Sequence, residues 1–190
     1  MEAPDEIHLR ESSSFGSFLS VKVRDLASLQ NLKSLGFSCL NLNSARELFR
    51  CLPDFASLTE LALPKVPGMR DWGFVAEALP TSKTLETVGF TLLGERREGW
   101  ARALDAGLCA DTPLSSVNLR ICGPMSETAL QALENLLRNK CLSSVSVIVD
   151  GDMPDSLAVT LARCLTGQTA VKSLELRVNG KLNFCCATVS

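Results

Sequence analysis

The sequence predicts an α/β solenoid, a horseshoe-like arc of strand–turn–helix units with parallel strands on its concave face and helices on its convex face. Two patterns of apolar residues predict this fold. One has strand periodicity and recurs about every 28 residues, and the other has helical periodicity and fills the intervals between its copies. Because one unit alone buries too little apolar surface to offset the entropy of ordering it, neighbouring units must stack.

Each expected strand has the pattern L-x-x-L-x-L, whose fourth and sixth positions are apolar and whose intervening positions are small or polar. This alternation is typical of a short strand with one buried face. Successive copies begin 26, 27, 29, 28 and 29 residues apart. A fainter copy precedes them, because Ile7 and Leu9 fall 28 residues before Leu35 and Phe37. The six clear copies begin at Leu32, Leu58, Leu85, Leu114, Leu142 and Val171.

Between the strand patterns, apolar residues recur at i, i+3, i+4 and i+7, which predicts one amphipathic helix per unit. Ser44 and Glu47 form a capping box, Ser126 is placed to cap a later helix, and Pro154 with Asp155 suits a first helical turn. The apolar helix positions are Ala45, Leu48, Phe49 and Leu52; Ala129, Leu130, Leu133, Leu136 and Leu137; and Leu157, Ala158, Leu161 and Leu165.

The chain divides into three parts along its length. We expect residues 1–31 to form a degenerate N-terminal repeat, residues 32–181 about six repeats, and residues 182–190 an irregular tail. No helical pattern follows the last strand, so either the tail folds back over the open core or the chain is one piece of a longer protein. The apolar residues of the tail are Leu182, Phe184 and Val189.

Composition restricts the possible functions. Hydrophobic residues make up 46% of the chain and charged residues 21%, and no apolar run reaches the ~18 residues that a membrane span needs. A formal net charge of -2 lacks the basic character of nucleic-acid-binding proteins. The first residues carry no secretory signal or transit peptide, so we expect a cytoplasmic location. A protein partner is expected, with no nucleic acid and no membrane.

The eight cysteines form no C-x-x-C pair that would begin a zinc site or a redox motif. Most lie beside leucines of the expected core. In a reducing compartment they should act as small buried hydrophobic residues, and the alternative is a disulfide. They are Cys39, Cys51, Cys109, Cys122, Cys141, Cys164, Cys185 and Cys186.

The repeat length, the L-x-x-L-x-L strands and helices such as E-T-A-L-Q-A-L-E-N-L-L-R-N-K-C-L resemble ribonuclease-inhibitor-type leucine-rich repeats. Similar repeats form the sensor end of NACHT-domain innate immune receptors, the NOD-like receptors. The resemblance spans residues 32–179 and implies a leucine-rich-repeat solenoid that binds proteins. In the family, the ninth position is usually Cys or Asn bonded to loop backbone, and Cys122 and Asn179 match it here. The other copies depart from the family pattern and have Leu40, Val66, Leu93 and Asp150.

Catalytic and nucleotide-binding motifs are not recognisable, and we expect no enzyme, no metal and no cofactor. The nearest likeness to a phosphate loop begins at Gly167, but its spacing to Lys172 is wrong and the glycine before that lysine is missing. His8 is the only histidine and should be a solvated strand residue. The run D-G-D-M-P-D over residues 150–155 lacks EF-hand spacing, so we expect an acidic loop that caps the following helix.

Two tryptophans and one proline have expected structural roles. Trp72 and Trp100 lie in segments that read as helical, so core or helix–helix packing is expected, and the alternative is an interface anchor. Pro64 falls at the end of the second clear strand pattern. It should disturb pairing with the next strand and bend the arc there.

The concave face is formed by positions three, five and seven of each copy, which point away from the core. These residues are mostly small and polar. The best candidates for partner contact are Asn118, Arg120, Glu175 and Arg177, and the alternative is a merely solvated sheet face.

Three functions follow as hypotheses. A cytosolic recognition module similar to the NOD-like receptor sensor region comes first, then a freestanding ribonuclease-inhibitor-like protein, and last an enzyme of unknown type.

Overall fold

The structure is a computed structural model that describes residues 5–9, 23–38, 40–64, 66, 72–93, 99–108, 111–166 and 170–180. Strands and helices alternate along these residues. The strands are β1 (Glu6–Leu9), β2 (Ser34–Phe37), β3 (Glu60–Leu63), β4 (Thr87–Leu93), β5 (Ser116–Cys122), β6 (Ser144–Asp150) and β7 (Ser173–Val178). The helices are α1 (Val23–Ala27), α2 (Leu42–Arg50), α3 (Gly73–Ala78), α4 (Gly99–Gly107), α5 (Glu127–Leu137) and α6 (Asp155–Thr166), with short 3-10 turns at Leu52–Asp54 and Leu79–Thr81.

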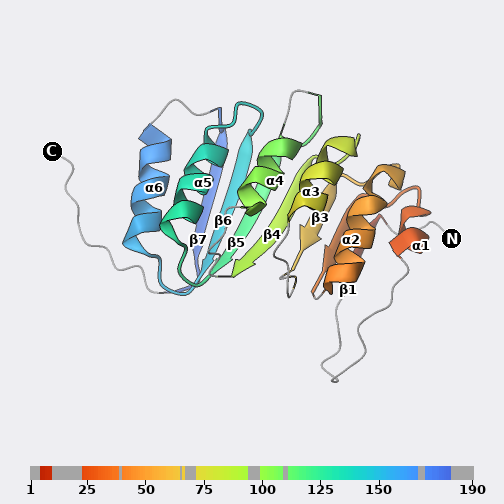
Figure 1. The fold of residues 1–190 in the computed structure, drawn as a ribbon, viewed down its shortest axis with the longest axis horizontal. Helices are drawn as coiled ribbons and strands as arrows, with labels where there is room; N and C mark the ends of the chain where they lie inside the picture. The colour runs from red at the N-terminus through yellow and green to blue at the C-terminus, as the bar shows by residue number, and fades with distance from the viewer. Residues whose placement is uncertain are drawn as a thin grey trace, which may run out of the picture.

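The seven strands form one parallel sheet in the order of the chain, from β1 to β7. Their register aligns equivalent positions of successive copies, so that Val88 pairs with Val117 and Val117 pairs with Val145. The helices lie in one layer against one face of this sheet, and each contacts its sequence neighbours (Figure 1). The α/β class, the parallel strands and the alternation with helices are therefore as predicted.

The faint N-terminal copy is a strand of the same sheet. Ile7 pairs with Leu35 and Leu9 pairs with Phe37 across β1 and β2, which is the alignment that the 28-residue offset predicts. The repeat pattern therefore begins before residue 32.

Equivalent apolar positions stack into ladders along the core. These side chains are at most 2% exposed, because each lies between the same position of the neighbouring copies and the helix layer. The buried first-position residues are Leu32, Leu58, Leu85, Leu114 and Leu142, and the buried fourth-position residues are Leu35, Leu61, Val88, Val117 and Val145.

One of the three predicted helix starts is wrong. Helix α2 begins at Leu42, and its N-cap is Asn41, whose Oδ1 accepts a hydrogen bond from the backbone N–H of Ser44 at 2.9 Å. Ser44 thus lies inside the first turn and is not the cap. Ser126 caps α5 as predicted, because its Oγ accepts from the N–H of Ala129. Asp155 begins α6 directly after Pro154, as predicted.

Aromatic side chains fill the space beside α3 and α4. Trp100 is fully buried in α4 and Trp72 is 7% exposed, which confirms the prediction of core packing. Trp72 lies directly before α3 and contacts Phe90 edge-to-face, with ring centroids 5.3 Å apart. In the described part of the chain, no helix combines the length and the apolar character needed to cross a membrane.

The loops after the strands differ between the two halves of the sheet. Strand β3 ends at Leu63, directly before Pro64, and its pairing with β4 stops there, as predicted for a proline at a strand end. Strands β5 and β6 are longer and are followed by Gly123 and Gly151, which have positive φ angles of 92° and 104°. This conformation suits glycine, and it turns the chain away from the sheet.

The cysteine prediction is confirmed for part of the set. Cys51 and Cys164 are buried, whereas Cys122 and Cys141 are half-buried. The other four cysteines lie outside the described residues, as does the tail with its apolar residues Leu182, Phe184 and Val189.

Candidate binding face

The face of the sheet that carries no helices is formed by positions three, five and seven of the copies, as predicted. In β5, Asn118 is half-buried and Arg120 is exposed, whereas the alternating residues Val117, Leu119 and Ile121 are buried. We call this side of the sheet the exposed face.

The N-terminal part of the exposed face contains one close contact. The imidazole of His8 lies over Gly36 on the neighbouring strand, where a Cβ would lie 2.3 Å from His8 Nδ1. Gly36 is therefore buried, although its position belongs to the exposed face. The rest of the His8 ring is solvated, as predicted, and its Nε2 lies 2.7 Å from Glu6 Oε1.

The four predicted contact residues lie on two strands separated by β6. Across β5, β6 and β7, one row of paired residues consists of Asn118, Ser146 and Glu175. The next row consists of Arg120, Ile148 and Arg177. Neighbouring strands lie about 4.8 Å apart, so the backbones of β5 and β7 are about 10 Å apart here. We call these six residues the β5–β7 patch.

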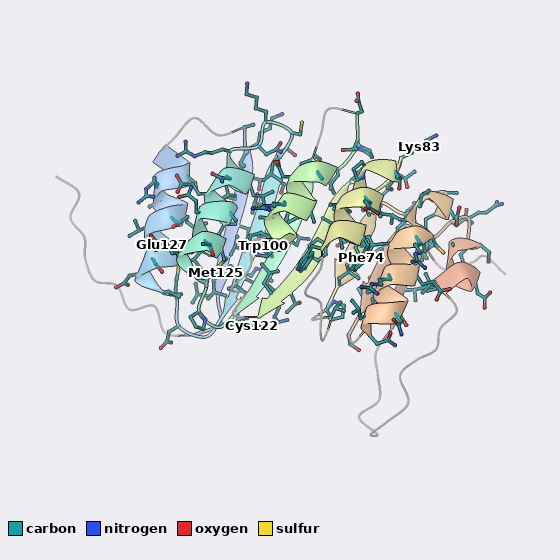
Figure 2. All side chains as sticks on the ribbon, in the orientation of Figure 1. Phe74, Lys83, Trp100, Cys122, Met125 and Glu127 are labelled. Atoms are coloured by element: carbon teal, nitrogen blue, oxygen red, sulfur yellow. The ribbon has the colours of Figure 1, made fainter. Side chains whose placement is uncertain are left out.

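Arg120 is held by a residue that was not among the predicted contacts. Its Nε donates to Asp150 Oδ2 at 2.6 Å and its Nη2 donates to Asp150 Oδ1 at 3.2 Å. The same carboxylate accepts from Asn179 Nδ2 at 2.9 Å and from Cys122 Sγ at 3.2 Å. These four side chains form the Asp150 cluster. Figure 2 shows Cys122 at the end of the sheet where β5 finishes.

The Asp150 cluster changes the acidity of its members. Hydrogen bonds from Arg120, and then from Asn179 and Cys122, hold the pKa of the Asp150 carboxyl well below its usual value. The hydrogen bond to Asp150, with the charge of its carboxylate, raises the pKa of the Arg120 guanidinium. The pKa of the Cys122 thiol is raised, first by burial and then by its hydrogen bond to Asp150. Asp150 is therefore an anion and Cys122 a neutral thiol, which is a poor nucleophile.

A second ion pair lies within β7. Arg177 Nε donates to Glu175 Oε1 at 2.8 Å, and Ser146 Oγ donates to Glu175 Oε2 at 3.1 Å. Arg177, followed by Ser146, lowers the pKa of the Glu175 carboxyl. Both arginines of the β5–β7 patch thus have carboxylate partners, and Ile148 lies between them in register.

The ninth-position residues do not have the surroundings that the family resemblance implies. Cys122 and Asn179 bond through their side chains to Asp150. The expectation that residues 150–155 form one helix-capping loop is wrong for Asp150, which ends β6 and pairs with Arg120. One signal in the sequence was overlooked. A glycine occupies the tenth position in the last three copies, as Gly123, Gly151 and Gly180, and it marks equivalent strand ends that lie side by side.

Among the described residues of the exposed face, Cys122 and Ser146 each contact a carboxylate, and neither lies near the histidine of the chain. His8 lies on β1 and Cys122 on β5, four strands away, which corresponds to about 19 Å. Among the residues that the structure describes, no group of three His, Cys, Asp or Glu side chains could hold a metal ion.

The helix layer contains a groove of about 440 Å³ between α4 and α5. It is lined on the two helices by small and polar side chains, including Ala101, Asp105, Gln131 and Ala132. This groove lies on the opposite side of the molecule from the β5–β7 patch and contains none of the predicted contact residues.

The β5–β7 patch and the Asp150 cluster thus place ion-paired charged side chains on the exposed face of the sheet. Comparison with known proteins finds no matching protein-family model, no matching curated protein and no matching solved structure.

Proposed function

We propose that this chain is a leucine-rich-repeat solenoid and that it acts as a cytosolic protein-recognition module, similar to the sensor region of NOD-like receptors. The observation that carries the proposal is the exposed face itself. Seven adjacent parallel strands present equivalent side chains in register, and the helices lie against the other side of the sheet. A broad, open surface of this kind suits contact with another protein better than it suits enclosure of a small molecule.

Two features favour a solenoid over a doubly wound nucleotide-binding fold. A doubly wound sheet reverses its strand order near the middle and carries helices on both faces, and its ligand binds at the reversal. Here the strands follow the order of the chain without reversal, and the helices form one layer. The strand order of the described residues therefore favours a solenoid over a fold that binds a dinucleotide at a reversal.

The β5–β7 patch is the best candidate for partner contact. Arg120 and Arg177 carry their charges on the exposed face with Ile148 between them, and arginine is enriched at the energetically important centres of protein interfaces. Asp150 and Glu175 hold the guanidinium groups in place, so less side-chain entropy is lost when a partner binds. A suitable partner would present both signs of charge around a small apolar contact.

The proposal is tested by quantitative affinity capture from a cytosolic lysate with three baits. These are the wild type, a variant with Arg120→Ala and Arg177→Ala, and a control with Gln131→Ala and Asn135→Ala on the exposed surface of α5. We expect a specific protein to be captured by the wild type and the control and lost from the arginine variant. Equal capture by all three baits, or loss only from the control, would contradict the proposal.

The same preparations separate the two recognition hypotheses. A ribonuclease-inhibitor-like protein would inhibit a pancreatic-type ribonuclease at stoichiometric concentration. We expect the wild type to leave that ribonuclease active. Inhibition that is abolished by the arginine variant would favour the inhibitor function instead.

A further inference from the structure

The last strand of the sheet leaves three apolar side chains incompletely covered on the helix-bearing face. Leu176 is 42% exposed, and Leu174 and Val178 are half-buried. Their register partners in β6 are at most 2% exposed. In the described stretch of residues 170–180, no helix follows β7 to cover this face. Within the described residues, the end of the sheet at β7 is therefore an incompletely covered apolar surface.

The same three residues carry the free backbone groups of the sheet edge. The N–H of Asn179 donates to the carbonyl of Val149 at 2.8 Å, so Asn179 directs its backbone groups toward β6. Alternate residues of a strand direct these groups to opposite sides, so Leu174, Leu176 and Val178 direct theirs away from β6. An unpaired strand edge of this kind is a template for another strand.

The charges on β7 favour pairing with a second copy of the same strand in antiparallel orientation. In an antiparallel pair of two β7 strands centred on Leu176, Glu175 lies opposite Arg177 of the second copy, and Arg177 lies opposite Glu175 of the second copy. Opposite charges at directly facing positions stabilise a strand pair. A parallel, in-register pair would instead place like charges opposite each other.

The backbone and the apolar side chains agree with the same register. Leu176 would face its own copy, and Leu174 would face Val178 of the second copy. These residues have free backbone groups, so they form the hydrogen-bonded positions of the pair. Glu175 and Arg177 then occupy the non-hydrogen-bonded positions, where facing side chains approach most closely.

We propose that a second copy of this chain binds to β7 in antiparallel orientation, with a two-fold axis at Leu176, and joins the two sheets into one. The contact is isologous, because each copy uses the same strand. It uses the outer edge of β7 and shares Glu175 and Arg177 with the β5–β7 patch. Leu176→Lys keeps both arginines of the patch, so loss of the dimer and loss of partner capture can be told apart.

Sedimentation velocity of the full chain between about 1 and about 200 μM tests the proposal, since this range detects dimers of micromolar to submillimolar dissociation constant. We expect a concentration-dependent dimer. Leu176→Lys should abolish it, because two like charges meet on the two-fold axis. Val159→Lys is the matched control, since Val159 is an exposed apolar residue on α6 (55% exposed) and lies outside β7. This control should dimerise like the wild type.

Charge reversal tests the register. Arg177→Glu alone should weaken dimerisation roughly tenfold, because acidic groups then face each other at two symmetric positions. Combining it with Glu175→Arg should restore the dimer. Circular dichroism melts below the dimerisation range check that the variants fold. Restoration would support the register, and failure of the combined variant to dimerise would overturn it.

Two further results would overturn the proposal. The first is a wild type that stays monomeric over the whole range. The second is a Val159→Lys variant that loses the dimer as fully as Leu176→Lys does.

Discussion

Arg120 and Asp150 form a two-point ion pair across β5 and β6, with Nε–Oδ2 and Nη2–Oδ1 distances of 2.6 and 3.2 Å. The pair joins the seventh position of one copy to the ninth position of the next. Because Asp150 also accepts from Cys122 and from Asn179, one carboxylate links three successive copies at the same end of the sheet. The Asp150 cluster therefore ties the last copies together on the surface, beyond the stacking of their core residues.

Asp150 should make the stability of the chain depend on pH in acid. A carboxyl whose pKa is lower in the folded than in the unfolded chain stabilises the fold above its unfolded pKa of about 3.9, and this contribution is lost as the pH falls toward the folded pKa. We expect urea-unfolding experiments at about pH 5 and about pH 2.5 to show a smaller acid-induced loss for Asp150→Asn than for the wild type. An equal loss in both proteins would show that the cluster does not hold this carboxyl ionised.

The reactivity of Cys122 should depend on the same carboxylate. Burial and Asp150 raise the pKa of the Cys122 thiol, and Arg120 lowers it. Replacing Asp150 with Asn removes a negative charge and leaves Arg120 in place, so the thiolate becomes easier to form. We expect Asp150→Asn to accelerate iodoacetamide labelling of Cys122, measured by peptide mass spectrometry. Cys141 is the internal control, and a parallel acceleration at Cys141 would indicate general loosening of the fold.

The repeat period predicted the parallel strands and their register, and the reason is physical. Each copy must align its apolar positions with those of its neighbours to close the core, so the spacing alone determines which residues pair. The pairing of Ile7 with Leu35 and of Val117 with Val145 follows from that constraint. The N-cap at Asn41 differs from the prediction because Ser44 and Glu47 offer a second capping pattern three residues later.

The candidate site was predicted only in part. The residues of the exposed face follow from strand alternation, and Arg120 and Arg177 lie there as expected. Their ion pairs were not predicted, because they depend on side-chain conformations and not on apolar periodicity. Asp150 is 30 residues from Arg120 in sequence, and its run D-G-D-M-P-D is typical of a loop. The glycine that follows it was the available sign that the strand continues to residue 150.

The strand register is tested by Val117→Asp. Val117 is fully buried between Val88 and Val145, so the substitution places an unpaired carboxylate in the core. We expect a loss of about 4 kcal/mol or more in the free energy of unfolding, seen as an unfolded spectrum or a greatly lowered circular dichroism melt. Arg177→Ala, measured at dilute concentration, should leave the melt almost unchanged. A Val117→Asp melt equal to wild type would contradict the register.

The start of α2 is tested by a pair of alanine substitutions. Asn41→Ala removes the side-chain acceptor for the N–H of Ser44 and should lower the free energy of unfolding by about 1 kcal/mol. Ser44→Ala lies within the first turn and should change it by less than about 0.5 kcal/mol. Chemical denaturation measures both. If Ser44→Ala proved the more destabilising change, the helix would begin at the capping box after all.

The docking of α6 on α5 depends on a buried carboxylate. Glu134 is 6% exposed and accepts from Nη2 of Arg138, the C-cap residue of α5, at 2.8 Å and from Nη1 of Arg163 on α6 at 3.2 Å. Both arginine side chains are more than half exposed, so each stays hydrated when the carboxylate is removed. We expect Glu134→Ala to lower the free energy of unfolding by about 1–2 kcal/mol, from the lost hydrogen bonds and the space left behind.

A comparison with Glu134→Leu separates these two causes, because leucine fills the space without accepting a hydrogen bond. Recovery of most of the lost stability by leucine would show that packing between α5 and α6 dominates, since buried ion pairs often contribute little net stability. Gln131→Ala, on the exposed surface of the same helix, is the control and should change the free energy of unfolding by less than about 0.5 kcal/mol. If Glu134→Ala were as mild as this control, the two arginines would not use Glu134 to hold α6 against α5.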